Sequence, residues 1–83
     1  MENLNYINTD KDQLLTELLE SGSCQAREGS DSVKFIEEND HGKWYELCDH
    51  QGTTMETSLD PEFLIVEMID GEISFQEMVG EEE

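Results

Sequence analysis

The chain has 83 residues, which suffices for one small domain spanning residues 1–83. Its 22 acidic residues outnumber four basic ones, so the formal net charge is −18. This excess argues against binding to nucleic acid or to anionic membranes, and it favours basic partners. Self-repulsion opposes a compact state, but periodic apolar segments and well-placed turn residues predict that the chain folds.

Cysteine usage and the N-terminus both point to the cytoplasm. Cys24 and Cys48 are too few for a disulfide framework. The N-terminal residues lack the basic start and apolar run of a signal peptide, and no apolar run approaches membrane-spanning length. We therefore predict a soluble, intracellular protein with reduced thiols.

The first predicted element is a helix that follows a lead-in over residues 1–8. A cap at Asn8, Thr9 or Asp10 starts the helix, which runs to about Glu20. Gly22 is predicted to end the helix in the left-handed αL conformation. Its apolar residues follow the i, i+1, i+4, i+5 spacing of one buried stripe: Leu14, Leu15, Leu18 and Leu19.

An antiparallel meander is predicted next, with strands at residues 23–28, 33–38, 43–48 and 53–57. Two similar turns, at residues 39–42 and 49–52, combine Asn or Asp with His and Gly about ten residues apart. A four-residue loop at 39–42 places Ile36 opposite Tyr45, and Lys34 opposite Leu47.

A final hairpin is predicted at residues 62–79, around the Asp70-Gly71 pair. Asp-Gly supplies the positive φ angles of a type I′ turn, the preceding run contains β-branched residues, and residues 73–76 alternate strictly. An alternative remains open, because Asp60 followed by Pro61 is also a helix start. In that case residues 63–69 form a short helix that ends at Gly71.

The predicted fold class is therefore α+β, with one N-terminal helix packed on a small antiparallel β-meander sheet. Residues 80–83 are predicted to be a frayed acidic tail. The expected core consists of Leu14, Leu15, Leu18, Leu19, Ile36, Trp44 or Tyr45, Leu47, Leu64, Val66, Met68, Ile73 and Phe75.

No motif indicates a metal, a cofactor or catalysis. Cys24, His41, Cys48 and His50 are zinc-binding residue types, but their spacing matches no familiar zinc module. Neither Asp-His turn continues as a calcium loop. The carboxylates are too numerous to single out an acid–base pair, so we predict a protein that is not an enzyme.

The acid excess instead suggests imitation of DNA. B-DNA presents rows of phosphate charge, and side chains at i and i+2 on a strand lie about 6.6 Å apart on one face. Carboxylates so placed could occupy the phosphate sites of a DNA-binding protein. The candidate partner-binding residues are Asp10, Asp12, Glu17, Glu20, Glu37, Glu38, Asp40, Glu46, Glu56, Glu67, Asp70, Glu72 and Glu77.

Some of these acids lie where local physics disfavours them. Glu20 opposes the dipole of the predicted helix at its C-terminal end, and Glu37 and Glu38 are adjacent within an apolar hairpin. Such costs are typical of positions where function overrides stability. Two other interpretations stay open: an acidic interaction module that binds a basic partner away from any DNA site, and a halophilic domain.

In size, charge and plan, the whole chain resembles small acidic proteins that bacteriophages use to disable host DNA-binding proteins. These include uracil-DNA glycosylase inhibitors, anti-restriction proteins and anti-CRISPR proteins. The host-takeover proteins of large lytic Bacillus phages that block the nucleoid protein HU are the most similar in plan. This resemblance implies a homodimer in the host cytoplasm or nucleoid, whose acid surface fills the DNA-binding saddle and arms of HU.

Overall fold

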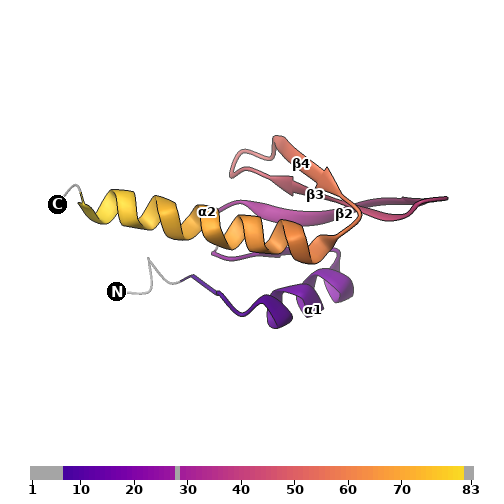
Figure 1. The fold of residues 1–83 in the computed structure, drawn as a ribbon, viewed down its shortest axis with the longest axis horizontal. Helices are drawn as coiled ribbons and strands as arrows, with labels where there is room; N and C mark the ends of the chain where they lie inside the picture. Colours follow the sequence, from indigo (N-terminus) through magenta and orange to yellow (C-terminus); the bar gives the residue numbers. More distant parts are fainter. Residues whose placement is uncertain (1–6, 28, 82–83) are drawn as a thin grey trace.

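A computed structural model gives the backbone of residues 7–27 and 29–81, with side chains as far as Ser74. Two helices and four strands follow in the order α1 (Lys11–Ser21), β1 (Ser23–Gln25), β2 (Ser32–Asn39), β3 (Gly42–Cys48), β4 (Thr54–Ser58) and α2 (Pro61–Glu81). The strands form one antiparallel sheet in the order β1-β2-β3-β4. Both helices pack side by side against this sheet (Figure 1). The α+β fold with an N-terminal helix and a meander sheet is thus confirmed.

Helix α1 begins and ends at the predicted signals. The Asp10 side chain accepts a hydrogen bond from the Gln13 backbone N–H, and Gly22 adopts a left-handed conformation with φ of 89°. The Gly22 N–H donates to the carbonyl of Leu18 over 2.8 Å. These bonds satisfy backbone groups that a helix end leaves free.

The β2–β3 pairing agrees with the predicted register only near the turn. Asn39 pairs with Gly42, so the connection is a two-residue turn rather than the expected four-residue loop. A β-bulge between Phe35 and Glu37 then shifts the register by one residue. Phe35, not Ile36, lies opposite Tyr45, and the predicted pair of Lys34 with Leu47 is also wrong. The bulge inserts one extra residue, which changes the face of every residue before it.

The predicted C-terminal hairpin is wrong, because residues 61–81 form one helix. Asp60 accepts hydrogen bonds from the backbone N–H groups of Glu62 and Phe63 and so caps α2. The helix continues through Gly71, whereas the helical alternative ended there. Its buried apolar residues repeat the i, i+1, i+4, i+5 spacing of a helix stripe: Leu64, Ile65, Met68 and Ile69. Burial of this stripe against the sheet overrides the β-propensity of single residues.

The core contains six of the twelve expected side chains, and a seventh, Leu15, is partly buried against it. Leu14 and Leu18 of α1 belong to the same core cluster as Tyr45 and Leu47 of β3. Tyr45 rather than half-buried Trp44 is the buried aromatic residue. Four expected core residues are instead exposed: Leu19, Ile36, Val66 and Ile73. The Phe75 side chain lies outside the described residues. Buried apolar residues that were not in the expected core are Cys24, Ala26, Val33, Cys48, Ile65 and Ile69.

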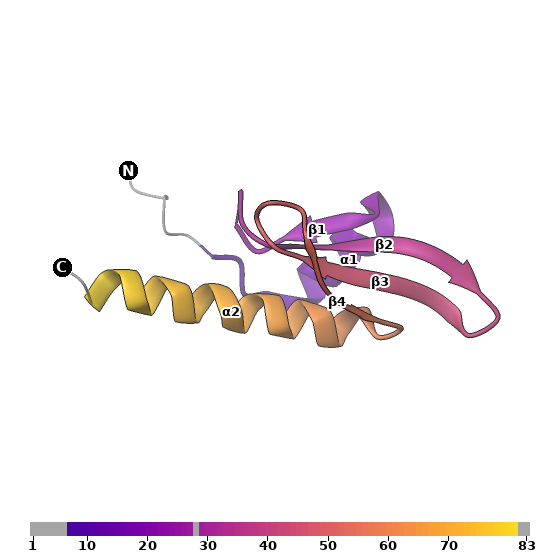
Figure 2. The same cartoon turned by 90° about the horizontal axis from the view of Figure 1, so that it is seen from above.

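The molecule is elongated, with dimensions of 49 × 21 × 18 Å. The second half of α2 extends past the sheet at one end, and the β2–β3 hairpin extends at the opposite end (Figure 2). Gly80 and Glu81 belong to α2, and fraying of the acidic tail over residues 80–83 stays a prediction. Residues 82 and 83 lie outside the described part.

Candidate partner-binding surface

Helix α1 carries exposed carboxylates along its solvent side. Asp12, Glu17 and Glu20 are exposed, and Glu17 and Glu20 are neighbours at i, i+3. Like charges at this spacing destabilise a helix. Asp10 is also exposed, but its carboxylate caps the helix, so it has a structural role as well.

The β2–β3 hairpin carries a second group of exposed acids: Glu37, Glu38 and Asp40. Glu37 and Glu38 are consecutive in the strand, so they project from opposite faces. Glu37 lies opposite Trp44, and Glu38 lies opposite Lys43. The hairpin therefore presents acids on both faces of its tip rather than in the single i, i+2 row that we considered from sequence.

The acids of β3 and β4 are less available. Glu46 is half-buried and accepts a 2.7 Å hydrogen bond from the Thr54 hydroxyl. Glu56 is also half-buried and lies opposite Leu47. Both carboxylates are partly withdrawn from the surface.

Helix α2 presents exposed Glu67 and Asp70, a second like-charge pair at i, i+3. Glu72, in contrast, is buried. Its carboxylate accepts hydrogen bonds of 3.3 and 3.1 Å from Nε and an Nη of Arg27. Glu72 thus belongs to an internal ion pair and not to the exposed acid surface. The Glu77 side chain lies outside the described residues.

All four basic residues of the chain lie beside acids of the same chain. Lys11 forms a 3.0 Å salt bridge with Glu62, which raises the pKa of the lysine, and Arg27 forms a 3.1 Å salt bridge with Glu72. Lys34 and Lys43 lie opposite glutamates in the sheet, namely Glu46 and Glu38. Within the chain no further lysine or arginine remains to balance the other carboxylates.

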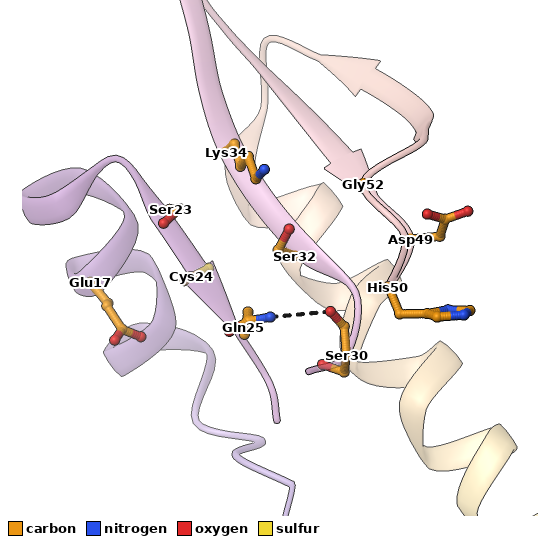
Figure 3. A pocket seen from close by; sticks show the side chains of 10 residues that line it. All are labelled: Glu17, Ser23, Cys24, Gln25, Ser30, Ser32, Lys34, Asp49, His50 and Gly52. Carbon is orange, nitrogen blue, oxygen red and sulfur yellow. Dashed lines mark hydrogen bonds between the residues drawn. The ribbon is translucent and has the colours of Figure 1, made fainter. Parts of the chain in front are cut away.

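A polar cavity of about 530 Å³ lies beside β1, β2 and the turn after β3 (Figure 3). Figure 3 shows Glu17 on one side of the cavity and the His50 ring on the other, pointing away from Cys24 and Lys34. Burial raises the pKa of the Cys24 thiol to about 11, so this thiol is protonated and unreactive at neutral pH.

Asp49, which also lines this cavity, is engaged in the turn that follows β3. Its carboxylate accepts hydrogen bonds from the backbone N–H groups of Thr53 and Gln51, each over 2.9 Å. These bonds lower the pKa of Asp49. The carboxylate thus holds the turn together.

The residues considered for zinc do not form a site in the described part of the chain. Both cysteines are free and buried. Across the described side chains, residues 7–27 and 29–74, the structure contains no group of three or more His, Cys, Asp or Glu that could hold a metal ion.

An apolar groove of about 230 Å³, which sequence reasoning did not identify, lies between α1 and the β2–β3 hairpin. It is lined by Leu18, Leu19, Gly22, Phe35, Lys43 and Tyr45. The sequence contains one signal for it: apolar Phe35 and Ile36 are adjacent in a strand, so both faces of that strand carry an apolar residue.

Neither helix, within the part of the chain that the structure describes, is long and apolar enough to cross a membrane. No protein-family model matches the chain, and the searches of curated proteins and of solved structures also find no match.

Proposed function

We propose that this protein is a non-enzymatic inhibitor that imitates DNA and occupies the DNA-binding surface of a basic host protein. The nucleoid protein HU is the proposed target, in line with the resemblance to phage host-takeover proteins. The site of action is then the bacterial cytoplasm or nucleoid. Exposed carboxylates on α1, on the hairpin and on α2 take the place of phosphates.

The observation that carries this proposal is the surplus of negative charge on a rod-shaped molecule. The four basic residues lie beside acids of the same chain, which leaves the net charge of −18 spread over a length of 49 Å. A DNA duplex of that length carries about 29 phosphate charges, since one charge falls every ~1.7 Å of axis. The two charge densities are of the same order.

The arrangement also weakens the fold. Glu17 with Glu20, and Glu67 with Asp70, form exposed like-charge pairs on two different helices, each unfavourable by about 0.2–0.5 kcal/mol. Solubility alone does not require such pairs. Such like-charge pairs are expected on a surface whose function is to attract the lysines and arginines of a partner.

A charge-neutralised variant tests the proposal. The substitutions Glu17→Gln, Glu20→Gln, Glu67→Gln and Asp70→Asn remove four exposed carboxylates whose side chains form no hydrogen bond or salt bridge with any described residue. We expect affinity for HU, measured by calorimetry at about 0.1 M salt, to fall at least tenfold, because both steering and contact depend on charge.

The matched control carries Thr16→Ser and Ser74→Ala, two exposed positions on the same helices. It should bind HU as the unaltered protein does. Binding that survives the fourfold neutralisation would contradict DNA imitation. Thermal denaturation of the neutralised variant should show a gain in stability from the relief of repulsion, which excludes unfolding as the cause of lost binding.

A second candidate, an acidic interaction module, is favoured by the exposed apolar side chains. Leu19 is 60% exposed and Phe35 is 42% exposed, and both line the apolar groove between α1 and the β2–β3 hairpin. A partner held mainly by these groups would bind through a salt-resistant contact and would not be displaced by duplex DNA. The two candidates are therefore separable by one competition experiment over a range of salt.

A further inference from the structure

The groove between α1 and the β2–β3 hairpin has an apolar interior that is open to solvent. Leu19 forms one wall, and Phe35 forms another with its ring edge-on to Tyr45, at a centroid distance of 5.7 Å. Leu18 and Tyr45 are buried at the base. The groove is therefore built on rigid core residues, and its exposed walls are free to contact a further apolar side chain.

Among the described residues, the one charged residue in the groove lining is Lys43, and exposed acids lie on the two elements that border the groove. Glu20 directly follows Leu19 on α1 and is exposed. On the hairpin, Glu38 is exposed and lies opposite Lys43, which lines the groove. A ligand that fits this surface needs an apolar side chain for the groove and positive charge around it.

A second copy of the chain does not meet that description. It carries the same net charge of −18, so seating one copy against the acids of another brings like charges together. A basic protein that presents an apolar side chain among lysines and arginines has the complementary charge.

Proteins that bend DNA through the minor groove have this combination of features. They contact phosphates with basic residues and insert apolar wedges such as Phe, Leu, Ile, Met or Pro between base steps. A DNA imitation directed at such a protein needs carboxylates in place of phosphates and an apolar slot in place of the opened base step. We propose that the α1–hairpin groove receives the apolar wedge residue of a minor-groove DNA-bending protein. This inference rests on the proposed function and assigns to the α1–hairpin groove the contact with the partner's wedge residue.

Leu19→Gln tests the groove without altering charge. Glutamine is a good helix former and Leu19 is already largely exposed, so the fold should persist. Met55→Gln is the matched control, because Met55 is 50% exposed on β4 and does not line the groove. Both variants are titrated by calorimetry into HU and into an HU variant whose wedge residue is changed to alanine.

We expect Leu19→Gln to weaken binding to HU at least tenfold, and Met55→Gln to change it less than twofold. Against wedge-less HU, which should already bind weakly, Leu19→Gln should have little further effect. The salt dependence of binding should match that of the unaltered protein, since no charge is lost. Phe35→Thr, on the opposite wall, should reproduce the result.

Three results would overturn the inference. Equal affinities of Leu19→Gln and Met55→Gln for HU would show that the groove is not in the contact. An equal loss against both forms of HU would show that the groove receives something other than the wedge. A shift in oligomeric state on Leu19→Gln, measured by sedimentation, would assign the groove to a second copy of the chain.

Failure of the proposed function itself has a different outcome. In that case the unaltered protein does not displace DNA from HU, or the charge-neutralised variant described above binds HU as well as the unaltered protein does. The charge experiment removes carboxylates and the groove experiment removes apolar contact, so the two experiments report on different properties of the surface.

Discussion

The Arg27–Glu72 ion pair connects the segment after β1 to the middle of α2. The Glu72 side chain is only 7% exposed and that of Arg27 is 29% exposed. Arg27→Ala should lower the free energy of unfolding by about 3 kcal/mol, near the lower end of the range for breaking a buried ion pair, because it leaves the Glu72 carboxylate buried without its partner. Denaturant titration measures this.

Replacing both partners is the control for that prediction. The double variant Arg27→Met with Glu72→Leu should be much closer in stability to the unaltered protein, since no buried charge remains. A loss below about 1 kcal/mol in Arg27→Ala would instead mean that the pair behaves as a surface salt bridge.

Ionisation of Asp31 should lower the free energy of unfolding as pH rises. Burial, followed by the nearby carboxylates of Glu72 and Asp49, raises the pKa of Asp31 above its ordinary value of 3.8, against a smaller opposing effect of His50 and Arg27. Between 3.8 and the raised pKa, the folded state binds more protons than the unfolded state, so stability falls as pH increases through this range. Asp31→Asn should therefore increase stability at pH 7, and the gain should vanish below about pH 3.8. Thermal melts across pH measure this.

Asp49 provides a control of opposite sign. Backbone hydrogen bonds lower the pKa of Asp49, so its stabilising effect is present above the ordinary pKa and is lost as pH falls through the lowered value. Asp49→Asn should therefore reduce stability at pH 7. If both asparagine variants shifted stability in the same direction, our explanation of the opposite pKa shifts of Asp31 and Asp49 would be wrong.

At the scale of elements, a substitution within α2 tests whether the segment around Gly71 is helical. Gly71 lies inside this helix, and an added Cβ would have no atom within 4 Å. Gly71→Ala should stabilise the protein by about 0.5–1 kcal/mol, because alanine is the better helix former. In a domain of this size, such a gain raises the melting temperature by a few degrees, roughly 2–8 °C.

Gly22→Ala should lower the stability of the protein, because the φ of 89° at the end of α1 disfavours any residue with a Cβ. A loss of stability in Gly71→Ala would favour the hairpin that Asp70-Gly71 predicted from sequence, since a type I′ turn also requires positive φ.

The elements that sequence reasoning identified are those with local signals. Asp10 and Gly22 mark the two ends of α1. Asn39 and Asp49 begin the turns that follow β2 and β3 of the meander. Helix α2 was assigned wrongly because Asp70-Gly71 is a strong local turn signal, whereas the deciding factor was burial of a stripe against the distant sheet. That stripe has the same spacing as the one that predicted α1, so the sequence did contain the helical signal.

The bulge near Ile36 and the burial of Glu72 had no such signal. A bulge adds one residue without changing composition, and the partner of Glu72 is Arg27, 45 positions earlier in the chain. The exposed acids were predictable as a set because charge is read directly from composition. Which of them serve structure depends on long-range contacts.

At the scale of the whole molecule, repulsion among the carboxylates should make stability depend on salt. Raising sodium chloride from about 0.05 to 0.5 M shortens the screening length severalfold, so the melting temperature should rise. The charge-neutralised variant should show a smaller rise. A halophilic domain would instead be unfolded at low salt and fold only at high salt, which circular dichroism would reveal.

The central claim is that the acid surface takes the place of DNA, and competition tests it most directly. A fluorescent DNA duplex bound to HU is titrated with the protein at several salt concentrations, and duplex release is followed by anisotropy. The account predicts full displacement of the duplex with an apparent affinity that falls steeply as salt rises. A duplex that stays bound while the protein itself binds HU, or displacement that is indifferent to salt, would contradict it.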